Sequence, residues 1–125
     1  IPDDWSEAQR ESYLREDNAR MLRLLTIHEA VPGHYLQGVY ANRCPSRVRA
    51  ILGSGVFAEG WAVYVTQVMM DAGYGADDPA LLLVHWKFYL RAVHNAILDV
   101  GIHTAAMSER DAVRIMVEEG FQEES

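Results

Sequence analysis

The sequence predicts an all-α protein, a bundle of helices. Apolar residues recur at intervals of three and four over long segments, and residues that cap or end helices separate these segments. No segment shows the alternation of apolar and polar residues that is typical of a half-buried strand. The chain has 125 residues, of which 50% are hydrophobic and 23% charged, as in an ordinary globular protein. We therefore expect one helical domain over residues 1–125, large enough for a hydrophobic core.

The first predicted helix begins near Ser6 and continues through His28 to Pro32. Proline has no amide hydrogen, and its ring clashes with the carbonyl group four residues earlier, which is that of His28. The glycine that follows accepts backbone angles that other residues avoid. A helical pattern then resumes at His34 and extends to about Ala41. We interpret the Pro-Gly pair as a bulge that interrupts one long helix.

The remaining predicted helices are each bounded by turn or capping residues. Their expected ranges are 46–52, 56–72, 79–103 and 108–119. The helix over 56–72 is apolar nearly all round, which is typical of a helix in the interior of a bundle. Asp78 at the N-cap and Pro79 at the first helical position begin the next helix, and Ser108 caps the last.

Composition and charge exclude several classes of function. The formal net charge of −7 argues against a nucleic-acid partner, because phosphate binding needs a basic surface. No apolar run approaches the roughly 20 residues of a membrane span. The single cysteine, Cys44, excludes an internal disulfide and a cysteine-based structural zinc site. Since the chain opens on Ile1 without a methionine and closes on an acidic stretch, we expect it to be part of a longer protein whose remainder is its partner.

The strongest chemical signal is the segment from His28 to His34, which reads HEAVPGH and is followed by Glu59 in AEGWA. Two histidines and a carboxylate are the ligands that many zinc hydrolases use, with water at the fourth position. The carboxylate beside the first histidine can remove a proton from that water. The pattern predicts His28, His34 and Glu59 as metal ligands and Glu29 as the general base.

The spacing of the histidines differs from the familiar HExxH pattern, in which they are four residues apart. His28 and His34 are six apart, and a regular helix would place the second imidazole about 120° around and about 9 Å along the axis from the first. Two ligands of one zinc ion must have their nitrogens about 3–3.5 Å apart. The Pro-Gly bulge would bring them together. The alternative is a helix that ends at Val31, with both histidines as ordinary polar residues; Glu59, followed by an apolar aromatic run, favours the metal site.

Other residues are weaker candidates. Trp61 is expected in the core, whereas the phenol of Tyr64 could stabilise an oxyanion near the metal. Asp99 and His103 are four apart on one helix face, so Asp99 could orient His103 or the pair could donate to the transition state. Alternatively, His103 only interacts with the dipole at the end of its helix. His85 is expected at a surface or an interface.

Ordered sequence blocks carry a family resemblance. They are residues 25–37 (LTIHEAVPGHYLQ), 57–64 (FAEGWAVY), 73–79, 90–92 and 99–103 (DVGIH). On these blocks the chain resembles the bacterial domain-of-unknown-function family 885, whose members are several times longer and are similar to helical metallopeptidases of the gluzincin type. The resemblance implies zinc at His28, His34 and Glu59, Glu29 as general base, and an extracytoplasmic location, either periplasmic or as a lipoprotein.

Two classes of function follow from these observations. The first is a zinc-dependent hydrolase that cleaves peptides or other carbonyl-containing substrates, with activity expected of the longer protein. The second is a helical binding or scaffold module with a structural or vestigial metal, in which a fourth protein ligand such as His103 would close the coordination sphere. Cobalt, manganese or iron could replace zinc, since two histidines and a glutamate suit several divalent metals. A metal-free helical bundle is the third alternative.

Overall fold

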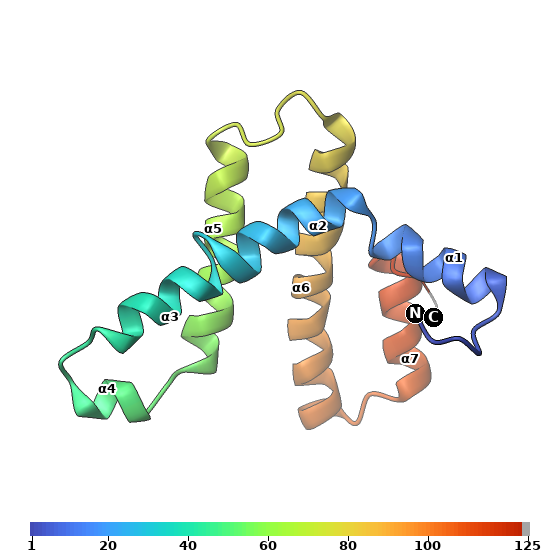
Figure 1. Ribbon diagram of the computed structural model, residues 1–125. Coiled ribbons are helices and arrows are strands. Elements are labelled where there is room, and N and C mark those ends of the chain that lie inside the picture. The colour runs from blue at the N-terminus through green and yellow to red at the C-terminus, as the bar shows by residue number, and fades with distance from the viewer. Residues whose placement is uncertain (124–125) are drawn as a thin grey trace. The chain divides into compact units, whose positions relative to one another are not determined.

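The computed structural model describes residues 1–123, and this part of the chain is all-α (Figure 1). In chain order the elements are α1 (Glu7–Glu16), α2 (Ala19–Leu25), the π-helical turn η1 (Thr26–Ala30), α3 (His34–Asn42), α4 (Arg47–Ile51), α5 (Gly55–Asp71), α6 (Pro79–Ala105), α7 (Glu109–Arg114) and the π-helical turn η2 (Ile115–Glu119). Residues 1–123 contain no strand, which confirms the predicted fold class. None of the helices within this range has the length and hydropathy needed to cross a membrane.

The chain divides into two compact units, which we describe separately. The first unit comprises Ile1–Met21 and Leu83–Ser125, and the second comprises Leu22–Leu82. The second unit holds the whole HEAVPGH segment and Glu59. Within it, η1 and α3 pack against α5 and against each other. Its fully or nearly fully buried apolar residues are Leu24, Ile27, Ala62, Val65 and Leu81.

The long first helix predicted from Ser6 through His28 is wrong, because the chain breaks between α1 and α2. Asp17 lies at the C-cap of α1 outside the helical region, at φ −90° and ψ 62°. The side-chain oxygen of Asn18 then accepts hydrogen bonds from the backbone amides of Arg20 (2.9 Å) and Met21 (3.1 Å). Short polar side chains compete with helical hydrogen bonds in this way, so the pair starts a new helix.

The other helix boundaries follow the capping residues of the sequence. The predicted ranges 46–52, 56–72 and 79–103 correspond to α4, α5 and α6. Ser108 accepts a hydrogen bond from the amide of Asp111 at 3.1 Å, as a capping residue of α7 should. Asp78 likewise accepts from the amide of Leu81 at 3.2 Å. The last predicted helix extends to Glu119 only because η2 continues α7 with π-helical geometry.

The prediction that the helix over 56–72 lies inside a bundle is not met by residues 1–123. Only Ala62, Val65 and Thr66 of α5 are buried. Val56 is 88% exposed and Phe57 is 64% exposed. Among the described residues, η1 and α3 are the main packing partners of α5, and they leave much of the helix surface exposed.

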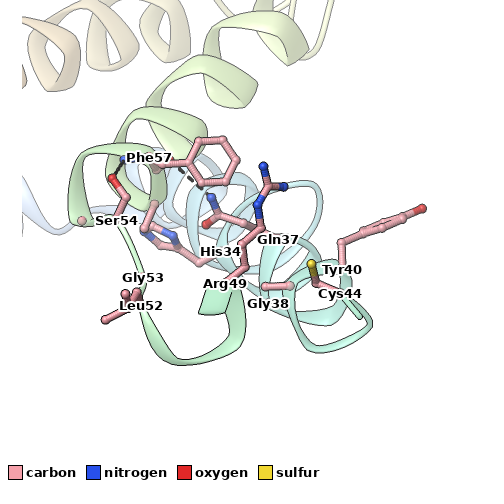
Figure 2. Close-up of a pocket in the computed structure, with 13 residues that line it drawn as sticks. His34, Gln37, Gly38, Tyr40, Cys44, Arg49, Leu52, Gly53, Ser54 and Phe57 are labelled. Atoms are coloured by element: carbon pink, nitrogen blue, oxygen red, sulfur yellow. Dashed lines mark hydrogen bonds between the residues drawn. The ribbon is translucent and has the colours of Figure 1, made fainter. Parts of the chain in front are cut away.

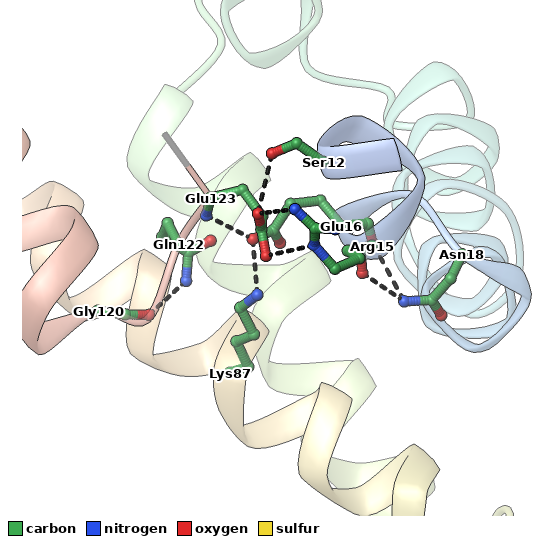
Figure 3. A network of polar contacts seen from close by, with 8 residues as sticks. All are labelled: Ser12, Arg15, Glu16, Asn18, Lys87, Gly120, Gln122 and Glu123. Carbon is green, nitrogen blue, oxygen red and sulfur yellow. Dashed lines mark hydrogen bonds and ion pairs between the residues drawn. The ribbon is translucent and has the colours of Figure 1, made fainter. Parts of the chain in front are cut away.

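A network of charged groups holds the C-terminal segment of the first unit to α1 (Figure 3). The Arg15 guanidinium donates two hydrogen bonds to the Glu123 carboxylate, at 3.0 and 2.9 Å. Ser12 donates a third at 2.9 Å. The Lys87 ammonium and the backbone amide of Glu123 both bond to Oε1 of Glu16, at 2.6 and 2.8 Å. The carboxylates of Glu16 and Glu123 therefore each pair with a cationic side chain and accept a hydrogen bond from a further donor.

The first unit also buries two histidines of α6. His85 is 1% exposed, so its predicted place at a surface or interface is wrong. Its ring centroid lies 5.1 Å from that of Trp86 and 6.3 Å from that of Tyr89, and such large aromatic neighbours shield an imidazole from water. His94 is 6% exposed, and its Nδ1 lies 3.0 Å from the carbonyl oxygen of Leu90, one helical turn earlier.

Candidate metal centre

Two helical elements, rather than one bulged helix, carry the HEAVPGH segment. His28 and Glu29 lie on η1, which ends where Val31 adopts extended backbone angles of φ −125° and ψ 124°. The Val31–Pro32 peptide bond is cis. His34 is the first residue of α3. The helix therefore ends at Val31, as the alternative interpretation supposed, but a second helix begins directly afterwards.

The connection at Gly33 leaves no room for a side chain. A Cβ atom built on Gly33 would overlap the carbonyl group of His28 and the carbonyl oxygen of Ile27. These are backbone atoms of η1, which cannot move aside as a flexible side chain can. Only glycine lets the start of α3 approach η1 so closely. The sequence suggested a glycine with unusual backbone angles; the structure gives Gly33 φ −74° and ψ −139°, and it also shows a close approach of two backbone segments.

Trp61 of α5 fixes the same connection from the other side. Its indole Nε1 donates a hydrogen bond to the carbonyl oxygen of Pro32 at 2.9 Å. The side chain is half-buried rather than part of a closed core. We predicted only an apolar role for Trp61, since a tryptophan pattern does not reveal where the indole N–H points. In the structure this residue positions the segment that joins the two histidines.

This arrangement brings the two imidazoles together. The ring centroids of His28 and His34 lie 5.0 Å apart, with their planes at 90°. One nitrogen of each ring and one carboxylate oxygen of Glu29 all lie within 4.8 Å of one another. On a regular helix the second imidazole would be about 9 Å further along the axis. The break at Val31 and the close approach at Gly33 therefore bring together two imidazoles that a spacing of six residues would separate on a regular helix.

Glu59 joins the group from α5. Its Oε2 lies 3.6 Å from Nε2 of His34. Two ligands at the corners of a zinc tetrahedron lie about 3.3 Å apart, since each is about 2.0–2.1 Å from the ion. The three donor atoms that lie within 4.8 Å of one another include one of Glu29, whereas the predicted ligand set contains Glu59. Both carboxylates are thus beside the histidines, and their division into ligand and base remains a prediction.

Burial favours the neutral form of the His28 imidazole, which is the form that binds a metal. The residue is 7% exposed, and desolvation is the main cause that lowers its pKa below 6.5, while the nearby Glu29 carboxylate partly opposes the shift. A lowered pKa keeps the imidazole neutral near pH 7, and a metal binds the neutral form. Two imidazoles and two carboxylates are also the chemical types that zinc prefers. The residues present therefore fit a zinc ion.

No contact links the remaining predicted residues, Tyr64 and the Asp99–His103 pair, to this cluster among the interactions of the described residues. Tyr64 is 61% exposed on α5, with its ring centroid 6.2 Å from that of Trp61. The predicted Asp99–His103 contact on α6 is present, with His103 Nδ1 3.1 Å from Oδ1 of Asp99. This pair is largely exposed and belongs to the first unit. The catalytic roles of Tyr64 and His103 remain predictions.

A pocket of about 810 Å³ opens beside His34 (Figure 2). It is lined by α3, α4, the start of α5 and the loop between α4 and α5, all within the second unit. We did not predict it, because the arginine of its lining, Arg49, looked like one of several scattered basic residues. Pockets arise from the packing of elements, which local sequence patterns do not encode.

Comparisons with known proteins place the chain in a family. Residues 4–125 match the model of a family described as "Bacterial protein of unknown function (DUF885)". No curated protein matches the chain. A solved structure from Shewanella oneidensis, described as "a putative lipoprotein of unknown function", is 46% identical with a TM-score of 0.84. The similarity covers 97% of this chain but 22% of that one, so the chain spans about a fifth of the length of its structural relative.

Proposed function

We propose that this chain, which belongs to the bacterial family of unknown function DUF885, carries the metal centre of a zinc-dependent hydrolase that cleaves peptide bonds. The observation that supports this function is the convergence of His28, His34 and Glu59 with a second carboxylate, Glu29, beside them. The remaining parts of the longer protein would complete the substrate cleft, since this chain covers 22% of its structural relative.

His28, His34 and Glu59 would hold the ion. Zinc supplies a Lewis acid at such a site and lowers the pKa of a water molecule there to about 7. His28 stays neutral because it is buried. Glu59 contributes a negative charge from a separate helix, and Trp61, two residues further along α5, holds the Pro32 carbonyl in place. The geometry of all three ligands thus depends on the packing of η1 and α3 against α5.

Glu29 would act as the general base that takes a proton from the attacking water molecule. Its carboxylate is exposed and lies within 4.8 Å of a nitrogen of each imidazole, so a water molecule at the cluster is within its reach. In the hydrolysis, the water oxygen forms a bond to the peptide carbonyl carbon as Glu29 takes the water proton. The C–N bond then breaks, and Glu29 delivers the proton to the leaving amine nitrogen. Tyr64 or His103 would stabilise the charge that develops on the carbonyl oxygen.

A second candidate function is favoured by the position of Glu29. Because a carboxylate oxygen of Glu29 lies within 4.8 Å of a nitrogen of each histidine, Glu29 could be a ligand instead of a base. With Glu59 as the other carboxylate, four protein ligands would close a tetrahedral site, as in structural zinc sites. The chain would then be a helical binding or scaffold module without turnover.

Metal content and turnover of full-length variants separate the two functions. Glu29→Gln should retain about one zinc ion per chain and lose peptide hydrolysis if Glu29 is the base, because a base contributes about 10²–10⁴-fold. His28→Ala and His34→Ala should lose the zinc. Glu7→Gln, an exposed glutamate on α1, is the matched control and should change neither. Loss of zinc in Glu29→Gln would favour the closed site, and full activity in that variant would contradict the hydrolase.

We also propose an extracytoplasmic location. The support is the similarity to the Shewanella oneidensis protein described as a putative lipoprotein. Fractionation of cells that produce the full-length protein would test it: recovery in the cytoplasmic fraction would contradict the proposal.

A further inference from the structure

The pocket adjoins the candidate metal centre at His34, which belongs to both. Its volume of about 810 Å³ lies within the roughly 300–1,000 Å³ that is usual for small-ligand sites. Figure 2 shows His34, Gln37 and Phe57 around this space, with Gln37 donating a hydrogen bond to the backbone oxygen of Phe57 at 3.3 Å. A ligand in the pocket would therefore lie beside His34.

Large apolar residues line the pocket, and each of them is exposed to solvent. Phe57 is 64% exposed, Leu52 71% and Tyr40 67%. Covering such surface stabilises a complex by roughly 25 cal/mol per Å² of apolar area. Gly38 and Gly53 also line the pocket, and a Cβ on either would meet no atom within 4 Å. The space above these glycines is open, so it can accept a bulky apolar group.

Arg49 gives the pocket its charge. Apart from the titratable His34, it is the one lining residue with a cationic side chain, and no aspartate or glutamate lines the pocket. Among residues 1–123, no carboxylate lies within ion-pair distance of Arg49. A guanidinium group forms its strongest complexes with carboxylates, which it can bind through two parallel hydrogen bonds. The ligand that complements this pocket has an apolar body and a carboxylate.

We propose that the pocket receives the C-terminal residue of a peptide substrate, with a large apolar side chain against Phe57 and the α-carboxylate paired with Arg49. This proposal rests on the hydrolase function, because it places the preceding peptide bond at the His34 end of the pocket. Hydrolysis breaks that C–N bond, adds the water oxygen to the carbonyl carbon and returns a proton to the amine. The product is a free apolar amino acid, and the enzyme is a carboxypeptidase.

Ligand binding tests the pocket without requiring turnover. Calorimetric titration of the full-length protein with N-acetyl-L-phenylalanine and with N-acetyl-L-phenylalaninamide compares a carboxylate with its uncharged equivalent. The acid should bind at least about tenfold more tightly, the effect of one charge-assisted hydrogen bond or ion pair. Arg49→Gln should abolish this difference. Arg47→Gln, an exposed arginine on the same helix that does not line the pocket, should leave it unchanged.

A second variant tests the apolar part of the pocket. Gly38→Leu would place a side chain in the open space above α3 and should weaken both probes about tenfold or more. Leucine favours a helix more than glycine does, so this variant should fold. Equal affinity for acid and amide, or a preference for the acid that survives in Arg49→Gln, would overturn the proposal. Absence of binding by either probe would mean that another part of the polypeptide fills the pocket, and would also overturn it.

The two proposals can fail separately. If Arg49-dependent binding of the acid is found but Glu29→Gln retains full activity, the pocket stands and the mechanism falls. If peptides are hydrolysed but free and amidated C-termini are cleaved with equal kcat/KM, the metal centre stands and the carboxypeptidase assignment falls.

Discussion

The close approach of η1 and α3 at Gly33 predicts that one added methyl group at this residue lowers both the stability and the zinc affinity. In Gly33→Ala the new Cβ would overlap backbone atoms of His28 and Ile27, so η1 and α3 must separate. Inserting a group into a packed site costs typically about 1–3 kcal/mol, and we expect about 3 kcal/mol because the obstructing atoms belong to a helix backbone. Separation of the two elements also moves His34 away from His28, and loss of a supporting contact at a metal site costs about 10–100-fold in affinity.

Gly38→Ala is the matched control, because it makes the same chemical change in the middle of α3. A Cβ at Gly38 meets no atom within 4 Å. Alanine favours a helix interior over glycine by about 0.5–1 kcal/mol, so this variant should be more stable than the parent. The same substitution at two positions five residues apart should therefore change the stability in opposite directions.

Urea unfolding and zinc titration of the full-length variants measure both effects. Gly33→Ala should lower the free energy of unfolding and weaken zinc binding, whereas Gly38→Ala should raise the free energy slightly and leave zinc binding unchanged. If Gly33→Ala were as stable as Gly38→Ala and bound zinc with parental affinity, the close approach would not be what joins the histidines, and the reasoning would be refuted.

Three further predictions concern hydrogen bonds. Trp61→Phe removes the donor to Pro32 and should cost about 1 kcal/mol of stability, with weaker zinc binding in the same titration; unchanged zinc affinity would contradict a positioning role. Hydrogen bonds from Arg15 are the main cause that lowers the pKa of Glu123 from 4.5 to about 2, so the carboxylate stabilises the fold fully above pH 4.5 and loses this effect as the pH falls toward 2. The urea midpoint of Glu123→Gln should consequently change less between pH 2 and pH 5 than that of the parent protein. An equal change in both proteins would show that the Arg15–Glu123 interaction does not stabilise the fold. Asn18→Ala should cost about 1 kcal/mol by loss of the α2 cap, and an unchanged urea midpoint would show that the cap is dispensable.

Local chemistry made much of the fold predictable. Ser108 and Asp78 have short side chains that accept helix amides, and both begin helices where the sequence placed them. The same chemistry explains the error near α2. Asn18 is a capping residue too, but the apolar periodicity that continues past it favoured an unbroken helix, and the pattern does not show which of two local preferences prevails.

Features that depend on contacts between distant residues were less predictable. The apolar pattern of α5 indicates only that its surfaces avoid water, and it does not say which element covers them. His85 is buried beside the rings of Trp86 and Tyr89, which a single polar letter in the sequence does not reveal. Arg49 became a candidate only when α3, α4 and α5 enclosed a pocket next to it.

The candidate site was predictable in its residue types but not in its mechanism of assembly. In a helix with the HExxH spacing, the hydrogen bonds of one helix hold both histidines on one face. Here His28 and His34 lie on separate elements, so no single helix can fix their distance. Contacts from outside must do so, and α5 provides one through Trp61, while Glu59 of the same helix is the proposed third ligand. Because both residues lie on the same turn of α5, displacement of this helix would remove the proposed ligand and release the connection between the histidines at once. The proposed metal binding would therefore be coupled to the packing of α5, which a single-helix motif does not require.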